Sequence, residues 1–394
     1  MLKRIAITVF VLCCLMCAAR AEVTVGAART AEYLPMLRGK RVALVCNHTS
    51  VVDSVHTLDM LLNAGIDVRL ILSPEHGFRG TAAEGQTVDD SVDPATSIPI
   101  FSLYGKKKGA ARLAELPDDI DVIVFDIQDV GMRFYTYYIN MIETMEWARS
   151  HNREYVVLDR PNPWGMKVDG PILDMKLRSG VGRLPVPVIH GMTLGELARM
   201  AVGEGWLEGK AGTDSLRLKI VTCTGYTHST RYKLPVWPSP NLRSMQAIYL
   251  YPSLCLFEGT VMSVGRGTDS PFTIFGHPNM TTADSTYTPT RFVAAGKALF
   301  SGRKCVGVDL SNIASEVLIA RGLNLQYVID AYRNKGMRRH SKEFFKPFFN
   351  LLIGNRRVRA MIESGCTAEE IHDTWREDVE QFNERRKPYL LYPL

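Results

Sequence analysis

Three side chains able to carry protons or bind anions follow one apolar run. Residues 70–73 read Leu-Ile-Leu-Ser, and after Pro74 come Glu75, His76 and, two residues further, Arg79. A short run of this kind is typical of a strand buried on both faces of a parallel sheet. Glu75 and His76 are of the types that transfer protons, and an arginine binds anions.

The same layout recurs at two more places. Residues 122–125 are apolar and lead into Asp126, with Asp129 and Arg133 close behind, and residues 156–159 read Val-Val-Leu-Asp. Open α/β sheets bind their ligands outside the carboxyl ends of such strands. We therefore expect these polar side chains to meet in one crevice.

Strand-like and helical patterns alternate through the first half of the chain, which predicts an α/β fold built on a parallel sheet. Thr193 and Glu196 have the spacing of a capping box that opens a further helix. The strand-like runs are residues 42–47, 68–73, 122–127 and 155–159, and the helical patterns are residues 57–63, 107–115 and 137–150.

The mature length of roughly 370 residues predicts two domains. The stretch 203–214, rich in glycine and charge, is the expected boundary, and a proline-stiffened loop at 235–241 presents Trp237 and Asn241 beyond it. A second capping box at 367–370 opens a C-terminal helix. The predicted segments are a signal peptide at 1–21, an α/β domain at 22–212 and a smaller α+β domain at 213–394.

The first residues read as a secretory signal. Lys3 and Arg4 precede an apolar run that ends at Cys17, and cleavage is expected after Ala21, before Glu22. The run is shorter than the roughly 20 apolar residues of a membrane span, and no later stretch approaches that length. We expect a periplasmic or secreted protein, with free export favoured over a lipid anchor at Cys17.

Composition excludes several classes of function. The formal charge of +6 includes three cations of the leader, so about +3 remains, and the short basic clusters lack the interleaved aromatics of a nucleic-acid surface. Five cysteines remain after the leader, and a chain of this length buries an adequate core without disulfides. We expect neither nucleic-acid binding nor a disulfide framework.

Cofactor motifs fail at the positions where they would be needed. After the first strand the chain reads Asn-His-Thr-Ser at 47–50, without the glycines that allow a backbone to approach pyrophosphate. The segment Gly-Arg-Gly-Thr at 265–268 is better explained as a tight turn that displays Arg266. No histidine pair or thiolate cluster has metal-ligand spacing. The sequence predicts no cofactor and no metal.

Glycoside cleavage needs only a protonated carboxylic acid and a second group that supplies water, a nucleophile or cation stabilisation. Glu75, at a buried strand end between Pro74 and Gly77, suits the first task. The residues alone leave open the alternative that Glu75 is a structural carboxylate paired with Arg79.

An ordered series of short motifs resembles the NamZ-type exo-β-N-acetylmuramidases, a glycoside hydrolase family formerly listed as a domain of unknown function. The resemblance runs from about residue 34 to the C-terminus. Its motifs are Pro-Glu-His-Gly (74–77), Phe-Asp-Ile-Gln-Asp-Val-Gly (125–131), Arg-Phe-Tyr-Thr-Tyr (133–137), Asp-Arg-Pro-Asn-Pro (159–163), His-Gly-Met-Thr (190–193), Pro-Ser-Pro-Asn (238–241), Tyr-Pro (251–252), Glu-Gly-Thr (258–260), Gly-Arg-Gly-Thr (265–268) and Tyr-Leu-Leu-Tyr (389–392).

The resemblance implies a Rossmann-like catalytic N-terminal domain, a C-terminal domain that completes the cleft, and release of terminal N-acetylmuramic acid from peptidoglycan fragments. The expected partners are peptidoglycan-derived muramyl saccharides. The predicted catalytic residues are Glu75, His76, Asp129 and Glu258. The predicted substrate-binding residues are Asp126, Arg133, Tyr135, Tyr137, Asn241 and Arg266.

Two of these assignments have a specific chemical reason. Muramic acid carries a lactyl carboxylate, which the guanidinium of Arg133 or Arg266 can bind through two parallel hydrogen bonds. Tyr135 and Tyr137 can stack on a sugar ring. Family members often have an acidic residue soon after the Gly80 position, whereas this chain has Thr-Ala-Ala-Glu at 81–84, so Glu84 is not assigned.

Two other functions are consistent with the pattern. A non-catalytic periplasmic receptor for sugars or muropeptides would need the arginines and aromatics but no proton donor, and a nucleotide-dependent oxidoreductase ranks third. Stereochemistry, substrate-assisted catalysis, fragment preference and oligomeric state are left open by the sequence.

Overall fold

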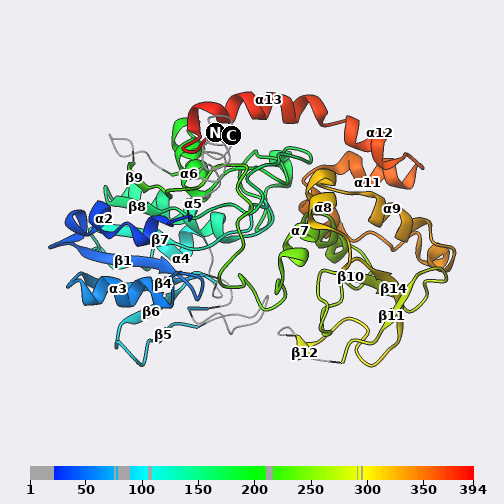
Figure 1. Cartoon of the computed structure of the whole chain (residues 1–394), viewed down its shortest axis with the longest axis horizontal. Coiled ribbons are helices and arrows are strands. Elements are labelled where there is room, and N and C mark those ends of the chain that lie inside the picture. The colour runs from blue at the N-terminus through cyan, green and yellow to red at the C-terminus, as the bar shows by residue number, and fades with distance from the viewer. Residues whose placement is uncertain are drawn as a thin grey trace, which may run out of the picture.

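The computed structural model of the chain describes residues 22–74, 77–78, 89–104, 109–209, 216–290, 292–293 and 296–394. Figure 1 shows two halves side by side, an α/β half in blue to green and a second half in green to orange. The predicted signal peptide and the predicted residues Glu75 and His76 lie outside the described residues.

A seven-stranded sheet forms the centre of the first half. Its order is β5-β6-β4-β1-β7-β8-β9, and all neighbours pair in parallel except β5, which is antiparallel to β6. The six parallel strands thus follow the spatial order 3-2-1-4-5-6 of a Rossmann fold, which confirms the predicted fold class. The strands are β1 (Arg41–Cys46), β4 (Asp67–Ser73), β5 (Ser91–Val92), β6 (Pro99–Ser102), β7 (Val122–Asp126), β8 (Glu154–Leu158) and β9 (Arg217–Val221).

Helices cover both faces of this sheet (Figure 1). Alternate residues of the central strands belong to two separate apolar clusters, one shared with α2 and α3 and the other with α5 and α6. Because both faces are buried, the strands are continuous apolar runs. The predicted capping box is present, with the Thr193 side chain accepting from Glu196 N at the start of α6. The helices are α2 (Thr30–Leu37), α3 (Thr57–Asn63), α4 (Ala110–Leu113), α5 (Tyr137–Ser150) and α6 (Leu194–Gly203).

The second half combines helices with a small antiparallel sheet in the order β10-β14-β11. Its strands are β10 (Ile274–His277), β11 (Ser285–Tyr287) and β14 (Cys305–Asp309), and its helices are α7 (Met245–Leu254), α8 (Ser315–Arg321), α9 (Gln326–Arg333), α10 (Pro347–Ile353), α11 (Arg356–Glu363), α12 (Ala368–Asp373) and α13 (Arg376–Arg386). The capping box predicted at Thr367 and Glu370 is present. The helix that it opens ends at Asp373, and α13 continues the chain after Trp375.

Short elements join these parts. The two-stranded hairpins are β2 (Val51–Val52) with β3 (Val55–His56) and β12 (Phe292–Val293) with β13 (Gly296–Lys297), and the 3₁₀ turns are η1 (Gly26–Ala28), η2 (Met175–Leu177), η3 (Cys255–Gly259), η4 (Lys335–His340) and η5 (Lys387–Tyr389).

Two segments beyond residue 212, strand β9 and the C-terminal residues, pack against the first half. Strand β9, predicted in the second domain, pairs in parallel with β8 and is the last strand of the main sheet. The C-terminal segment also returns to the first half, where Tyr392 Oη donates to Asp159 Oδ2 at 2.6 Å and accepts from Cys223 N at 2.9 Å. The end of the sheet therefore does not coincide with the predicted boundary at 212/213.

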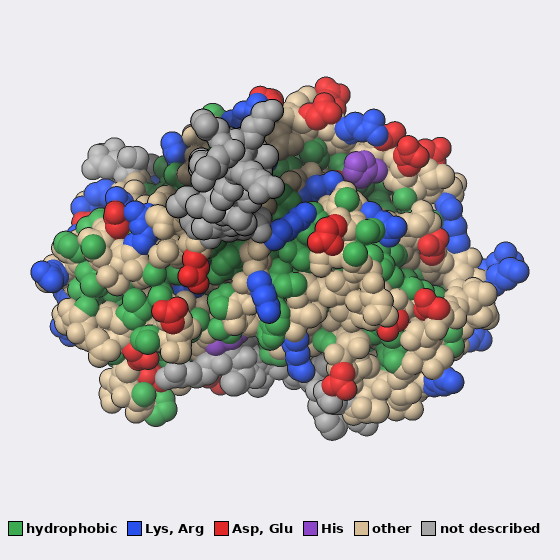
Figure 2. Space-filling view, viewed as in Figure 1, with side chains coloured by type: hydrophobic (Ala, Val, Ile, Leu, Met, Phe, Trp, Pro, Cys, Tyr) green, Lys and Arg blue, Asp and Glu red, His purple; other side chains and the backbone are tan. Residues whose placement is uncertain are grey.

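The five described cysteines are free thiols, and four of them are buried. In the part of the chain that the structure covers, no helix is long and apolar enough to cross a membrane. On the face in Figure 2, acidic and basic side chains are mixed.

Candidate active site

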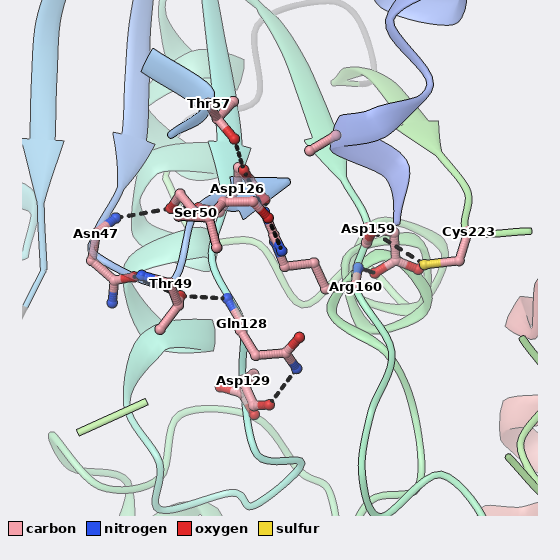
Figure 3. A network of polar contacts seen from close by, with 12 residues as sticks. Asn47, Thr49, Ser50, Thr57, Asp126, Gln128, Asp129, Asp159, Arg160 and Cys223 are labelled. Carbon is pink, nitrogen blue, oxygen red and sulfur yellow. Dashed lines mark hydrogen bonds and ion pairs between the residues drawn. The ribbon is translucent and has the colours of Figure 1, made fainter. Parts of the chain in front are cut away.

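The carboxyl ends of β1 and β7 lie side by side, because Cys46 pairs with Asp126 in the parallel ladder. These are the first and fourth strands of the 3-2-1-4-5-6 order, so their ends form the point where the strand order reverses. Ligands of open α/β sheets bind outside this point. Asn47 directly follows β1, and Gln128 and Asp129 follow β7 (Figure 3).

Asp126 is fully buried and already bound within the protein. Its carboxylate accepts from Arg160 Nε at 2.5 Å and Nη2 at 2.9 Å, and from Thr57 Oγ1 at 2.5 Å (Figure 3). Arg160 is also buried, so the pair is desolvated and hydrogen-bonded. The structure thus gives Asp126 a structural pairing inside the sheet edge, and Asp126 is not among the residues that line the cavity described below.

Asp129, also at this edge, has no cationic partner among the residues that the structure describes. Its Oδ1 accepts from Gly131 N at 2.6 Å, while Oδ2 is buried and has no hydrogen-bond partner in the part of the chain that the structure describes. Burial disfavours the charged form and raises the pKa of Asp129 to about 7. A carboxyl group with this pKa can donate or accept a proton near neutral pH.

A cavity of about 820 Å³ is formed by residues of both halves. It contains five of the ten predicted site residues, namely Tyr135, Tyr137, Asn241, Glu258 and Arg266. Residues that are far apart in sequence therefore converge on one cavity.

Aromatic rings form one wall of this cavity. Tyr135 packs edge to face against Tyr137 at 4.9 Å and Tyr251 at 6.0 Å between centroids, and Tyr251 packs against Phe272 at 5.0 Å. The hydroxyls of Tyr135 and Tyr137 each donate to Pro238 O at 3.0 Å. These two hydrogen bonds join the wall to the loop that carries Asn241.

Glu258 and Arg266 form an ion pair in the cavity lining. Glu258 Oε1 accepts from Arg266 Nε at 2.7 Å and Nη2 at 2.5 Å, with only 19% and 17% of the two side chains exposed. Arg266 lies over the ring of Phe272 at 4.9 Å. Gly265 and Gly267 have φ of 75° and 83°, so the predicted tight turn displays the arginine. Glu258 orients the guanidinium.

Asn241 lines the cavity from the proline-stiffened loop. Its backbone N–H donates to Ser239 Oγ at 3.3 Å, while its side-chain amide has no hydrogen bond to any residue that the structure describes. The ring of His48 binds Trp237 O at 2.9 Å, which attaches the same loop to the carboxyl end of β1. The amide can therefore bind a ligand without breaking an internal contact.

Arg133, predicted to bind the lactyl carboxylate, lies in the protein interior and not in the cavity lining. It is fully buried, and its guanidinium donates to the backbone carbonyls of Pro171 (2.7 Å), Val186 (2.8 Å), Leu352 (3.1 Å) and Ile353 (2.8 Å). Since these carbonyls come from both halves, Arg133 holds the halves together.

The flanks of Glu75 and His76 are described although these two residues are not. Strand β4 ends at Ser73, as the apolar run predicts, and Gly77 N donates to Pro74 O at 3.1 Å with φ of 75° at Gly77. The described residues on either side of Glu75 and His76 are thus joined by a hydrogen bond, while the role of Glu75 stays a prediction.

Comparison with known proteins identifies the family. The chain matches the N-terminal model of exo-β-N-acetylmuramidase NamZ over residues 42–246 and the C-terminal model over residues 249–392. The chain belongs to the NamZ family. It is 35% identical over 383 residues to the peptidoglycan β-N-acetylmuramidase NamZ of Bacillus subtilis (strain 168), covering 92% of this chain and 89% of that protein.

Two solved structures of DUF1343 family proteins from Bacteroides fragilis share the fold. One is 48% identical with a TM-score of 0.85, covering 95% of this chain and 99% of that chain. The other is 26% identical with a TM-score of 0.79, covering 94% and 99%. The resemblance to NamZ-type proteins stated from the motifs is thereby confirmed.

The cavity of this NamZ family member also contains charged residues that the sequence did not single out. Arg178 and Arg183 lie on a tight hairpin, where Arg178 pairs with Glu208, and Arg183 pairs with Glu146 at 2.5 Å and Glu143 at 3.5 Å. Their charges are balanced by acids brought in from α5 and the segment after α6. No local sequence signal marks them, because the pairing partners are distant in the chain.

Proposed function

We propose that the protein is an exo-acting β-N-acetylmuramidase that releases terminal N-acetylmuramic acid from the non-reducing end of peptidoglycan fragments. The observation that carries this proposal is the match to both NamZ family models along nearly the whole chain, together with the named activity of the Bacillus subtilis relative. The enzyme would be a glycoside hydrolase of cell-wall turnover.

The cavity suits a small saccharide. Its volume of about 820 Å³ is within the range of sites that enclose small ligands, and residues of both halves line it. Aromatic faces such as those of Tyr135 and Tyr251 bind the apolar face of a sugar ring, and the Asn241 amide offers a donor and an acceptor.

Arg266 is the arginine that supports selectivity for muramic acid. It lies in the cavity lining beside Phe272, with its fork fixed by Glu258. A lactyl carboxylate bound by this guanidinium would distinguish a muramide from a glucosaminide, which lacks that carboxylate. Glu258, predicted as catalytic, acts in this account by positioning Arg266.

Cleavage of the glycosidic bond needs a proton on the leaving oxygen. Glu75, which follows the last residue of β4 by two positions in the sequence, remains our proposed general acid. Glu75→Gln should slow cleavage of a muramyl disaccharide, a poor leaving group, far more than cleavage of a nitrophenyl muramide, whose leaving group departs largely unaided. Equal slowing of the two substrates would move this role to Asp129.

The leader predicted at 1–21 supports export to the periplasm or beyond. Amino-terminal sequencing of the native protein should give a chain that begins near Glu22. An active protein that retains Met1 in the cytosol would contradict this part of the proposal.

The activity is tested with the disaccharide of N-acetylmuramic acid linked to N-acetylglucosamine. Released sugars are separated by chromatography, and free N-acetylmuramic acid is the expected product. Binding of the disaccharide without any release would favour a non-catalytic muropeptide receptor instead.

A further inference from the structure

Three buried polar side chains at the ends of β1 and β7 each retain a hydrogen-bonding atom without a partner. Within the described part of the chain these atoms are Asn47 Nδ2, Gln128 Oε1 and Asp129 Oδ2. All three residues are buried, and Ser73 Oγ at the end of the neighbouring strand β4 is a fourth such atom. Folded proteins leave few buried polar atoms unpaired, so a group of them at one sheet edge needs an explanation.

The hydrogen bonds around these side chains fix which atom is left over. Asn47 Oδ1 accepts from both Thr49 N (2.9 Å) and Thr49 Oγ1 (2.6 Å), so the remaining atom of Asn47 is the amide donor. Gln128 Nε2 donates to Asp129 O and Pro161 O, both at 2.8 Å, so its remaining atom is an acceptor. The edge therefore presents one donor, one acceptor and one carboxyl oxygen.

These atoms belong to one connected group. Gln128 N donates to Thr49 Oγ1 at 3.0 Å, so the network that orients Asn47 also holds Gln128 (Figure 3). Asp129 follows Gln128 in sequence and precedes Tyr135 of the cavity wall on the same connection between β7 and α5. The group lies at the carboxyl ends of β1 and β7, where the strand order reverses, and none of its three residues is in the lining of the cavity described above.

The complement of this group is a secondary amide next to a hydroxyl. An amide carbonyl can accept from Asn47 Nδ2, an amide N–H can donate to Asp129 Oδ2, and a hydroxyl can donate to Gln128 Oε1. A phosphate or carboxylate fits poorly, because an anion would face one carboxyl oxygen and one amide oxygen. Since bulk water is excluded at these atoms, hydrogen bonds formed there are stronger than in solution.

We propose that Asn47, Gln128 and Asp129 form the subsite that recognises the acetamido group of an N-acetylated sugar. This inference rests on the proposed function, because that function supplies a substrate with an acetamido group at the 2-position. Asn47 binds the acetamido oxygen and Asp129 the acetamido N–H, while Gln128 accepts from a hydroxyl of the same sugar.

The test compares binding of two monosaccharides to the full mature protein by isothermal titration calorimetry. N-acetylmuramic acid is compared with 3-O-lactylglucose, which has a hydroxyl in place of the acetamido group. The wild type should bind N-acetylmuramic acid at least about tenfold more tightly, as expected for hydrogen bonds to buried groups.

Two isosteric variants exchange hydrogen-bond donor and acceptor at the unpaired atoms. Asn47→Asp replaces a donor by an acceptor, and Asp129→Asn replaces an acceptor by a donor while Gly131 N retains an oxygen partner. Each variant should lose the preference for the acetamido sugar and bind 3-O-lactylglucose within about threefold of the wild type. Asn350→Asp is the control for the same amide-to-carboxyl change, since Asn350 lies in α10 of the second half and its buried Oδ1 also has no partner among the described residues. It should retain the preference.

The inference would be overturned if the Asn47 and Asp129 variants bound both sugars equally more weakly, or if they kept the wild-type preference. It would also be overturned if the wild type bound the two sugars equally well. If Asn47→Asp does not fold, binding of the two sugars to Asp129→Asn alone tests the subsite. Asp129→Asn is the safer variant because it removes a buried carboxyl group, whereas Asn47→Asp adds one. Release of N-acetylmuramic acid by the wild type tests the proposed function separately. Cleavage without acetamido preference would refute only the subsite, and preference without cleavage would refute only the hydrolase.

Discussion

Replacing Arg266 by alanine should weaken recognition of muramides far more than of glucosaminides. The side chain is only 17% exposed and lies in the cavity lining, so its hydrogen bonds to a carboxylate are little screened by water. Hydrogen bonds to a charged partner contribute about 1.5 to 3 kcal/mol, which corresponds to a loss of about 10- to 150-fold in kcat/KM for the muramide. The glucosaminide should lose only a few-fold.

The ion pair with Glu258 requires a control, because Arg266→Ala leaves that carboxylate without its guanidinium. The double variant Glu258→Gln with Arg266→Ala removes both charges and should show the same selective loss. Arg266→Lys keeps the charge but loses the fork, so its kcat/KM for the muramide should lie between the wild type and Arg266→Ala.

The assay measures kcat/KM for nitrophenyl β-N-acetylmuraminide and for the matching glucosaminide with each variant. The ratio of the two constants isolates the lactyl group, since the ring and the leaving group are shared. If Arg266→Ala lowers both constants by the same factor, Arg266 supports the ring or the fold, and the lactyl assignment is refuted.

Three further predictions concern stability and pH. Burial raises the pKa of Asp129 from 3.8 to about 7 and that of Asp159 to about 6, so the native protein retains protons that the unfolded chain releases. The contribution of Asp129 to the free energy of unfolding should fall by at most about 4 kcal/mol as pH rises from 4 to 7. In urea unfolding, the total fall should therefore be smaller in Asp129→Asn than in the wild type, and an equal fall in the two proteins would contradict this. Arg133→Met should lower the urea-unfolding free energy by about 3 kcal/mol or more, because four backbone carbonyls lose their hydrogen-bond donor. The ratio of kcat/KM for the muramide to kcat/KM for the glucosaminide should stay unchanged. A changed ratio would mean that Arg133 contributes to substrate binding. Tyr392→Phe should lower the urea-unfolding free energy by about 1 to 3 kcal/mol, because Asp159 Oδ2 loses a buried hydrogen-bond donor. Tyr389→Phe is the control, since its hydroxyl donates to Glu204, and an equal or larger loss of stability in the control would contradict this prediction.

The central sheet could be predicted because its strands are buried on both faces and therefore read as continuous apolar runs. Strand β9 carries a weaker signal, since exposed Arg217 and Lys219 alternate with half-buried Leu218 and Ile220. That alternation suits a strand at the edge of the main sheet as well as one in a separate sheet. The glycine-rich stretch before it is the reason that the expected boundary lies at 212/213, on the N-terminal side of β9.

The cavity residues Glu258 and Arg266 could be singled out because a glycine-flanked arginine and a nearby carboxylate are visible as local motifs. Arg133 has an equally visible motif, but its environment depends on carbonyls near residues 171, 186 and 352, which no local pattern reveals. An arginine bound to carbonyls and one that awaits a ligand look the same in sequence.

Asn47 and Gln128 could not have been chosen from the sequence as members of a subsite. Both are uncharged, and amides of this kind commonly cap turns or bind backbone groups. Only the positions of Thr49 and Pro161 show that each amide is left with one unpaired atom. The information lies in hydrogen-bond partners that the fold brings together.

The β-N-acetylmuramidase activity of this NamZ family member is tested most directly by incubating the mature protein with a chromogenic β-N-acetylmuraminide and, in parallel, the matching glucosaminide. We expect rapid release of the chromophore from the muraminide and little from the glucosaminide. No release from either substrate, or a preference for the glucosaminide, would contradict this expectation.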